Sequence, residues 1–263
     1  MKVLKWIGIV VGSLVGLVIV AGVVFGFVGG SKLDANHAGE DFGPTALGTA
    51  DLERGRYLVE DVIGCAGCHG EGLAGTPEFA EGFPVNSFAA PNLTSNGVGA
   101  FLDQDDWVNA LRHGVGHDGR GLIVMPASGF AKLTADDLAS VIAYVEQVPA
   151  AGEAMPPRDF GFLGQILVGV GMAPDEYSLA QGVEQYDVEP AATVEYGEYV
   201  DAITCATCFI DMSDWTRDDF MTAMIDGVLP DGSDVNPDDP GAGWDLADPE
   251  REALWLYVES QQG

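Results

Sequence analysis

The pentapeptide Cys65-Ala66-Gly67-Cys68-His69 decides how the rest of the chain is interpreted. Two thiols three residues apart, followed at once by an imidazole, form the attachment site of a c-type haem. Each thiol can add across one vinyl group of the haem, and the adjacent imidazole can then ligate the iron. A redox-active dithiol and half of a zinc site have a similar spacing and remain alternatives. The motif predicts one covalent haem c, bound by Cys65, Cys68 and His69.

The N-terminal segment predicts a membrane anchor. The run from Ile7 to Val28 carries no charge, and a helix needs roughly 20 apolar residues to cross a bilayer. A cleaved signal peptide is the alternative, but its apolar core is typically about 7–15 residues long and ends at a small-residue cleavage site, for which this run has no good match. Lys2 and Lys5 precede the run, so the positive-inside rule places the N-terminus in the cytoplasm. We expect a single span in a bacterial cytoplasmic membrane, with the remaining chain on the periplasmic or extracellular side.

The composition narrows the range of partners. The chain of 263 residues has 41 acidic and 11 basic residues, and its formal net charge is -30. Such a charge repels nucleic acid, so no nucleic-acid partner is expected. It favours basic protein partners or a salt-rich environment, and both interpretations stay open. All four cysteines lie in two CxxC pairs, which agrees with haem attachment outside the cytoplasm and leaves no spare thiol.

Residues 51–149 predict a compact helical unit. A first helix containing Tyr57 should reach nearly to the pentapeptide. A second helix should begin near Asp103, with acidic residues in its first turn, where the helix dipole favours them. A third should start at Thr134, a suitable N-cap followed by apolar residues at helical spacing. Long loops between these helices leave room for a flat porphyrin at the centre of the unit.

Further motifs follow the pentapeptide along the same unit: Pro91-Asn92-Leu93-Thr94, Gly114-Val115, Asp118-Gly119-Arg120, Met125-Pro126 and Tyr144-Val145. With them, residues 51–149 resemble a class I cytochrome c domain of the kind found in membrane-anchored bacterial electron-transfer proteins. The resemblance covers the whole unit and implies electron transfer. It also implies that the first and last helices cross closely at Gly55 and Tyr144, because a residue without Cβ lets the ring approach the backbone.

The resemblance implies the second axial ligand of the iron as well. Met125 stands before Pro126 and ahead of the last helix, where the family places its axial thioether. A soft sulfur ligand stabilises ferrous iron and raises the reduction potential. His113, His117 and Met155 are the rival ligands.

Three residues around the haem follow from the same resemblance. A ligating histidine normally donates its other ring N–H to an acceptor that fixes its orientation. The carbonyl of Pro91 matches the position of that acceptor in cytochromes c. Arg112 and Arg120 are the basic residues nearest the expected haem propionates, although each could equally be a solvated surface cation.

The C-terminal part of the chain repeats the first unit imperfectly. At an offset of 113 residues, the matching pairs include Asp106 with Asp219, Trp107 with Phe220, Gly114 with Gly227 and Tyr144 with Tyr257. So many matches in one register predict that residues 191–263 descend from a second cytochrome c domain. Gly197 and Tyr257 would be its helix-crossing pair.

The haem-binding parts of this second unit are damaged. Cys205 and Cys208 correspond to the first CxxC pair, but Phe209 stands where the histidine should be. All four histidines of the chain lie in its first half. We therefore expect a degenerate unit without haem, whose two cysteines are reduced, disulfide-bonded or otherwise inert. A haem held by thioethers, with an iron ligand from elsewhere, is the alternative.

The expected fold class is all-α, with an N-terminal transmembrane helix, a cytochrome c domain and a second, shortened cytochrome c-like domain. The expected boundaries are 1–29 for the anchor, 30–50 for a linker, 51–149 for the haem-binding unit, 150–190 for the inter-domain linker and 191–263 for the degenerate unit. Within the inter-domain linker, the apolar stretch from Phe160 to Met172 is too short to span a bilayer. It is expected to pack between the units or to dock on a larger membrane complex.

These features predict a membrane-anchored, extracytoplasmic cytochrome that carries single electrons between redox partner proteins, among which a respiratory or photosynthetic membrane complex is one candidate. The alternative is a cytochrome subunit of a membrane dehydrogenase or quinol-oxidising complex, with the degenerate unit as a docking module. A dihaem peroxidase would need a second haem, and Phe209 argues against it. Since no catalytic group independent of the haem stands out in the sequence, the chain is expected to carry electrons and not to be an enzyme.

Overall fold

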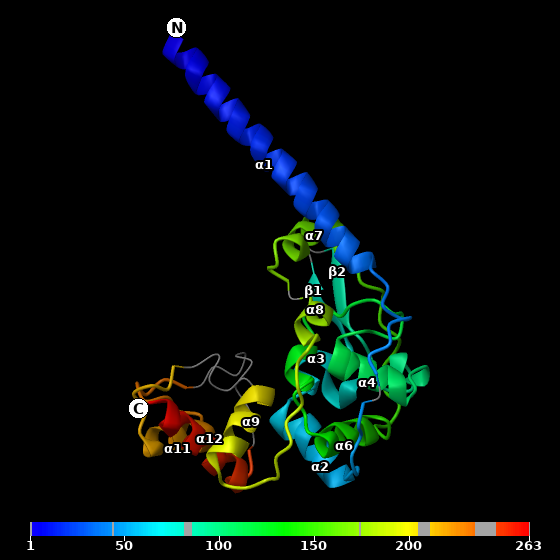
Figure 1. Cartoon of the computed structure of the whole chain (residues 1–263), viewed down its shortest axis with the longest axis vertical. Helices are drawn as coiled ribbons and strands as arrows, with labels where there is room; N and C mark the ends of the chain where they lie inside the picture. Colours follow the sequence, from blue (N-terminus) through cyan, green and yellow to red (C-terminus); the bar gives the residue numbers. More distant parts are fainter. Residues whose placement is uncertain are drawn as a thin grey trace.

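The computed structural model describes residues 2–43, 45–81, 86–173, 175–204, 211–234 and 246–262. A long N-terminal helix projects away from the rest of the molecule, and two helical units lie side by side below it (Figure 1). The first unit contains the pentapeptide. The second unit is formed by the C-terminal helices.

Helix α1 (Lys2–Asp34) is longer than a bilayer is thick. Its 33 residues correspond to about 50 Å at the rise of an α-helix, and its most apolar window has a mean hydropathy of 2.8. Most of its side chains are exposed, whereas Gly26, Gly29 and Leu33 near its C-terminal end are buried. Length and composition make α1 a candidate membrane anchor or signal sequence.

The first unit is built mainly from short helices joined by loops. In chain order its elements are α2 (Leu52–Tyr57), the π-helical turn η1 (Leu58–Val62), α3 (Ala66–His69), η2 (Glu71–Leu73), β1 (Thr76–Glu81), β2 (Ser87–Ala90), η3 (Val98–Ala100), α4 (Gln104–His113), α5 (Ala127–Phe130) and α6 (Ala135–Val145). Asp103 caps α4 in a reciprocal capping box, and the Thr134 side chain caps α6. The predicted starts of the second and third helices are therefore confirmed.

Helices α2 and α6 cross at Gly55. A Cβ on this residue would lie 2.1 Å from the carbonyl oxygen of Ser140 and 2.8 Å from Cβ of Tyr144. Only a glycine fits in that space, so its missing side chain is what lets the two helices touch. The predicted pairing of Gly55 with Tyr144 is confirmed.

A two-stranded antiparallel sheet shows that the all-α expectation is too simple. Strands β1 and β2 pair with Thr76 opposite Ala90. Phe79 and Phe88, one from each strand, make an edge-to-face contact with ring centroids 5.8 Å apart. Aromatic residues favour strands because they pack across a pleated surface. The unit is therefore mainly helical with a small sheet in a region expected to be loop.

The second unit contains α9 (Val194–Thr204), α11 (Arg217–Asp226) and α12 (Asp248–Gln261). Helices α9 and α12 cross at Gly197, where a Cβ would lie 1.9 Å from the carbonyl oxygen of Ala253 and 2.8 Å from Cβ of Tyr257. The predicted pairing of Gly197 with Tyr257 is confirmed. The prediction that the second unit has lost its haem rests on Cys205, Cys208 and Phe209, which lie outside the described residues.

The local structure of the two units repeats at the offset of 113 residues. Asp103 caps α4 and Thr216 caps α11, each in a capping box with an aspartate three residues later. Gly114 ends α4 and Gly227 ends α11, both in the left-handed backbone conformation. Isolated β-bridges then join Val115 to Gly121 and Val228 to Asp234. The helix, its cap and the following turn are thus built alike in both units.

A buried ionic network joins the two units. The guanidinium of Arg54 on α2 donates two hydrogen bonds to Asp137 on α6, at 2.8 and 2.9 Å, and a third, at 2.9 Å, to Glu250 on α12. It also donates to the hydroxyl of Tyr196, while Tyr199 donates to Asp137 at 2.6 Å. Both tyrosines belong to α9. One arginine of the first unit therefore pairs with a carboxylate from each unit, which ties the units together.

The expected inter-domain linker does more than connect the units. Its first helix, α7 (Gly161–Gly169), packs along the C-terminal part of α1 (Figure 1). Its second helix, α8 (Glu176–Ala180), contacts α4 and α5 of the first unit. The apolar stretch from Phe160 to Met172 therefore lies against the N-terminal helix and not between the two units.

Candidate haem site

His69 ends the short helix α3 and is held in one orientation. Its Nδ1 lies 2.8 Å from the carbonyl oxygen of Pro91, which can accept a hydrogen bond from a protonated Nδ1. That tautomer leaves a lone pair on Nε2, which makes no hydrogen bond within the described part of the chain. The side chain is buried, and burial lowers the pKa of His69, so its neutral form is favoured. A neutral imidazole with one nitrogen engaged and the other available is what an iron ligand requires.

Of the two thiols of the pentapeptide, Cys65 lies at the N-cap of α3 and Cys68 within the helix. Cys65 precedes the helix, where its N–H donates to the carbonyl of Val59 at 2.9 Å, and Cys68 lies one turn later with an exposed side chain. Burial raises the pKa of Cys65 to about 12 and also raises that of Cys68. Reactive dithiols have lowered pKa values instead, so the redox-dithiol alternative is disfavoured. The donor set fits a haem c held by two thioethers and one imidazole.

The turn that carries Pro91 is fixed by Asn92. This side chain is buried, and its amide nitrogen donates to the carbonyl of Ala151 at 2.7 Å. Its amide oxygen accepts from both the N–H and the hydroxyl of Thr94. Asn92 therefore keeps the Pro91 carbonyl in place against His69. The sequence motif contained this residue, but the role depends on contacts with the linker that the motif does not reveal.

Met125 lies on the loop between α4 and α5. It is half-buried and packs against the main apolar core, which includes Trp107 and Leu111 of α4 and Phe130 of α5. The preceding residue, Val124, has a φ of 73°, a conformation that costs a β-branched residue about 1–3 kcal/mol. Strain of this kind persists where the surroundings force a backbone geometry. Here it lies directly beside the predicted iron ligand.

The buried carboxylate of Glu176 holds the Met125 loop, and the sequence analysis did not identify it. Its Oε2 accepts the N–H of Ser128 at 3.0 Å and the hydroxyl of the same residue at 2.8 Å. The backbone N–H of Glu176 donates to the carbonyl of Leu122 at 3.0 Å. The start of α8 is thus hydrogen-bonded to Leu122 before Met125 and to Ser128 after it. A lone glutamate in a linker carries no sequence signal for this role.

The rival ligands occupy different places. Met155 touches the backbone at Gly75, whose N–H donates to the carbonyl of His69 at 2.7 Å. Met155 therefore lies beside the Asn92 segment, which follows the carbonyl bonded to Nδ1 of His69. His117 is exposed. His113 stacks on Phe42 with ring centroids 4.2 Å apart, and its buried Nε2 has no hydrogen-bond partner among the described residues. His113 remains the rival that needs an experimental test.

The two arginines expected near the propionates both have protein partners. Arg112 donates to the carbonyl of Leu133 at 3.3 Å. Arg120 pairs with Asp118 on the same turn, with Nε and Oδ2 2.7 Å apart. Each keeps further donors for other contacts, since a guanidinium has five N–H groups.

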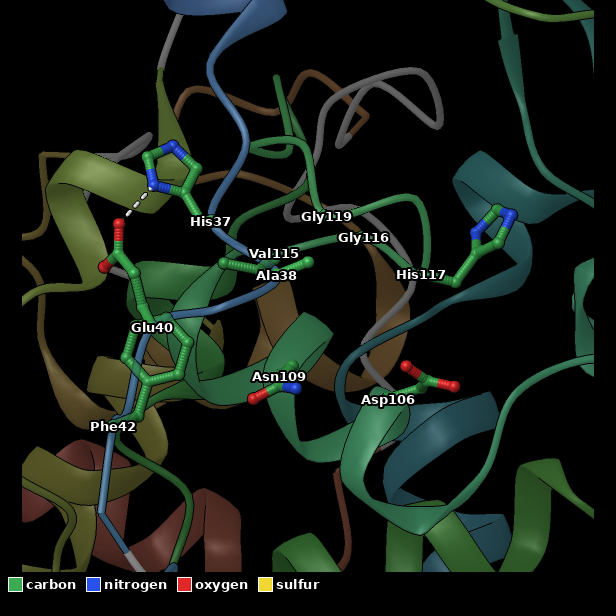
Figure 2. A pocket seen from close by; sticks show the side chains of 10 residues that line it. All are labelled: His37, Ala38, Glu40, Phe42, Asp106, Asn109, Val115, Gly116, His117 and Gly119. Atoms are coloured by element: carbon green, nitrogen blue, oxygen red, sulfur yellow. Dashed lines mark hydrogen bonds and ion pairs between the residues drawn. The ribbon is translucent and has the colours of Figure 1, made fainter.

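A small pocket beside α4 is distinct from the predicted haem site. Its volume is about 80 Å³, and it is lined by His37, Ala38, Glu40, Phe42, Asp106, Asn109, Val115, Gly116, His117 and Gly119. His37 and Glu40, joined by a contact of 2.7 Å, stand on one side and His117 on the other (Figure 2). Pockets that enclose a cofactor usually measure about 300–1,000 Å³. This one is too small for a porphyrin.

Comparison with known proteins supports the same interpretation. Residues 50–145 match the family described as cytochrome C oxidase, cbb3-type, subunit III. The chain is also 24% identical, over 207 residues, to the fructose dehydrogenase cytochrome subunit of Gluconobacter japonicus. That alignment covers 72% of this chain and 39% of the relative, so the chain spans about two fifths of the relative's length. The family match covers the pentapeptide and the helices that surround it.

Proposed function

Because the chain is a c-type cytochrome, and so an electron-transfer protein, we propose that it carries electrons through a single haem bound by Cys65, Cys68 and His69. Met125 is proposed as the second axial ligand, and the carbonyl of Pro91 orients His69. The observation that carries this proposal is the His69 ring, which is buried and bonded to Pro91 through Nδ1.

The residues around the site restrain the proposed iron ligands, which favours rapid electron exchange. When bound, the haem supplies an iron that accepts and releases one electron at a time. Pro91 restrains the ring of His69, and Glu176 restrains the loop of Met125, so both side chains keep their positions when the charge changes. The apolar core beside Met125 keeps water away from that side.

Haem quantitation tests the single-haem proposal. The pyridine haemochrome assay on the purified full chain should give about one haem per polypeptide, with the spectrum of a haem attached by two thioethers. A value near two would contradict the proposal that the second unit has lost its haem. A value near one that persists after Cys205→Ser and Cys208→Ser would place the haem in the first unit.

We further propose that α1 is retained as a membrane anchor. Leu33, near its C-terminal end, is buried in a cluster with Ile123 and Phe160. Arg158 donates hydrogen bonds to the carbonyls of Leu33 and Gly121, both at 2.9 Å. Cleavage after Val28, at the end of the uncharged run, would also remove Gly26, which is buried against Phe162 of α7. Mass spectrometry of the protein from washed membranes should therefore find α1 intact, and a shortened soluble protein would show that α1 is a signal sequence.

The relative suggests a more specific role, as the cytochrome subunit of a membrane dehydrogenase. Its aligned region is longer than the match to the first unit, so it supports a second unit that belongs to the same type of protein. We propose that this degenerate unit serves as a docking module. Purification from native membranes should bring down a dehydrogenase, whose substrate reduces the haem of the copurified chain. A chain that purifies alone and is reduced only by soluble carriers would support the independent electron carrier instead.

A further inference from the structure

Helix α7 presents an apolar surface beside α1. Nine residues long, it carries no charged side chain. One face, with Gly164 and Val168, is buried against the protein. Much of the remaining surface of this helix and of the turn after it is exposed. The exposed fractions are 40% for Leu163, 43% for Val170, 73% for Met172 and 54% for Phe162, whose ring also lies against Gly26 of α1. Four large apolar side chains on one short segment form an unusual surface for a water-soluble region.

The packing of α7 against α1 is close. A Cβ on Gly29 would lie 1.8 Å from the carbonyl oxygen of Gln165, and one on Gly169 would lie 2.0 Å from the carbonyl oxygen of Phe25. Membrane helix pairs also use small residues to let their backbones approach this closely, because van der Waals packing drives their association in lipid. The contact is formed at the end of the uncharged run of α1, next to the first unit (Figure 1).

Polar groups mark the level at which this apolar region ends. Lys32 follows the contact along α1 and lies 3.8 Å from the carboxylate of Asp175. Arg158, just before α7, reaches the last turn of α1. Long basic side chains near the end of a membrane helix can keep their charged groups at the level of the headgroups. The N–H groups after α7 are also satisfied: those of Val170, Gly171 and Met172 donate to carbonyls within the helix, as a lipid environment demands.

We infer that α7 lies in the interfacial region of the bilayer leaflet next to the haem unit, with Phe162, Leu163, Val170 and Met172 among the acyl chains. The inference rests on the proposed anchoring of α1. At about 14 Å, α7 is too short to span the bilayer, so it is an interfacial segment. Its apolar surface continues that of α1, where Val24 and Phe27 are 53% and 80% exposed, and this continuity favours lipid as the occupant.

This segment fixes the first unit relative to the membrane. Phe160, at the start of α7, contacts Phe88 of β2 with ring centroids 5.2 Å apart. Asp159 pairs through its backbone with Ser87 of the same strand. Two membrane contacts, α1 and α7, hold a body more firmly than one flexible tether, so the haem unit keeps one face toward the bilayer.

Site-specific photocrosslinking tests the inference on the full haem-loaded chain, in vesicles of phosphatidylcholine and phosphatidylglycerol and in native membranes. A benzoylphenylalanine is placed at Met172, at Leu163, at Val15 in the middle of α1, or at Ile225 on α11. Ile225 is the matched control, because it is apolar and 62% exposed but belongs to the second unit. An unchanged haem spectrum shows that each variant is folded.

We expect lipid adducts at Met172 and Leu163 in yields close to that at Val15, with background yield at Ile225. Lipid adducts at Val15 without adducts at Met172 and Leu163 would overturn the inference and leave the anchor intact. Adducts from Met172 to a protein in native membranes would also overturn it, in favour of a docking surface. Absence of lipid adducts at Val15 would refute the proposed anchor itself, and with it the role of α7.

Discussion

At the scale of single residues, the site depends on groups that hold the proposed iron ligands from behind. The Pro91 carbonyl orients His69, and Asn92 keeps that carbonyl in place. The other proposed ligand is Met125. The strained Val124 precedes it, and the buried Glu176 holds Ser128 after it. Each ligand is thus supported by a chain segment distant in sequence.

The assignment of Met125 predicts a spectroscopic change. Met125→Ala should abolish the weak near-infrared band that arises from sulfur bound to ferric iron, and it should lower the reduction potential. Axial ligands set haem potentials over a range of about 0.8 V, so the change should be large. Absorption spectroscopy and potentiometric titration measure both effects.

Two matched variants complete this test. Met155→Ala should leave the band and the potential unchanged, because Met155 packs beside Gly75 and the Asn92 segment. If His113→Ala removed the low-spin ligation while Met125→Ala did not, the second ligand would be His113.

Glu176 should stabilise the loop that carries Met125. Hydrogen bonds to a charged group are worth about 1.5–3 kcal/mol each, and this carboxylate accepts two from Ser128. Glu176→Ala is expected to lower the free energy of unfolding by about 2–3 kcal/mol and to weaken the near-infrared band. Denaturant unfolding and the ferric spectrum measure these effects. Glu184→Ala, at an exposed position of the same linker, should change neither, and equal effects of the two substitutions would refute the positioning role.

At the scale of elements, the helix pairs of both units depend on one glycine each. Gly55 lets α2 meet α6, and Gly197 lets α9 meet α12. In both pairs, the atom nearest to a Cβ added on the glycine would be the carbonyl oxygen of the residue four positions before the tyrosine of the partner helix. A shared solution at equivalent places supports the proposed common origin of the units.

Adding a single methyl group at these crossings should therefore be costly. Overpacking typically destabilises by about 1–3 kcal/mol, so Gly55→Ala and Gly197→Ala should each lower stability by that amount in chemical unfolding. Alanine otherwise favours helices by about 1 kcal/mol over glycine. Gly129→Ala in α5, where the nearest atom would be 3.9 Å away, should be neutral or stabilising. Stability gains at Gly55 or Gly197 would refute the close crossing.

At the scale of the whole molecule, Arg54 couples the two units. Its side chain is 19% exposed and pairs with Asp137 and Glu250, whose side chains are 9% and 6% exposed. Desolvation opposes the charge of Arg54, but the hydrogen bonds and the negative charge of Asp137 raise its pKa overall. The guanidinium therefore stays charged, and the two carboxylates depend on it.

Arg54→Met should leave two buried carboxylates without their cation. Breaking a buried ion pair on one side typically costs about 3–5 kcal/mol, and unfolding in guanidinium chloride should show a loss of that size. Arg217→Met is the control, since Arg217 and Glu252 are 53% and 36% exposed and exposed pairs contribute about 0–1 kcal/mol. A loss at Arg54 no larger than that at Arg217 would mean that the network does not join the units.

The sequence by itself determined the features that depend on neighbours close along the chain. The haem attachment motif, the caps at Asp103 and Thr134, and the apolar run of α1 are local, because a few adjacent residues carry their chemistry. The crossing glycines could be predicted from the family resemblance and the internal repeat, and they fit because a close helix contact permits only glycine. The haem-binding roles of Cys65, Cys68, His69, Pro91 and Met125, like the loss of the second haem, stay predictions.

The tertiary structure decided the features that join distant residues. The pairing of β1 with β2 places Phe79 against Phe88, and Phe88 also contacts Phe160 of the linker. Glu176 acquires its role only because α8 folds back onto the Met125 loop. The role of a buried charge or an exposed apolar surface depends on the groups that surround it in space. The order of residues along the chain does not state directly which groups these are. For this reason only the fold reveals that the linker contacts the proposed iron site at one end and lies against the proposed membrane anchor at the other.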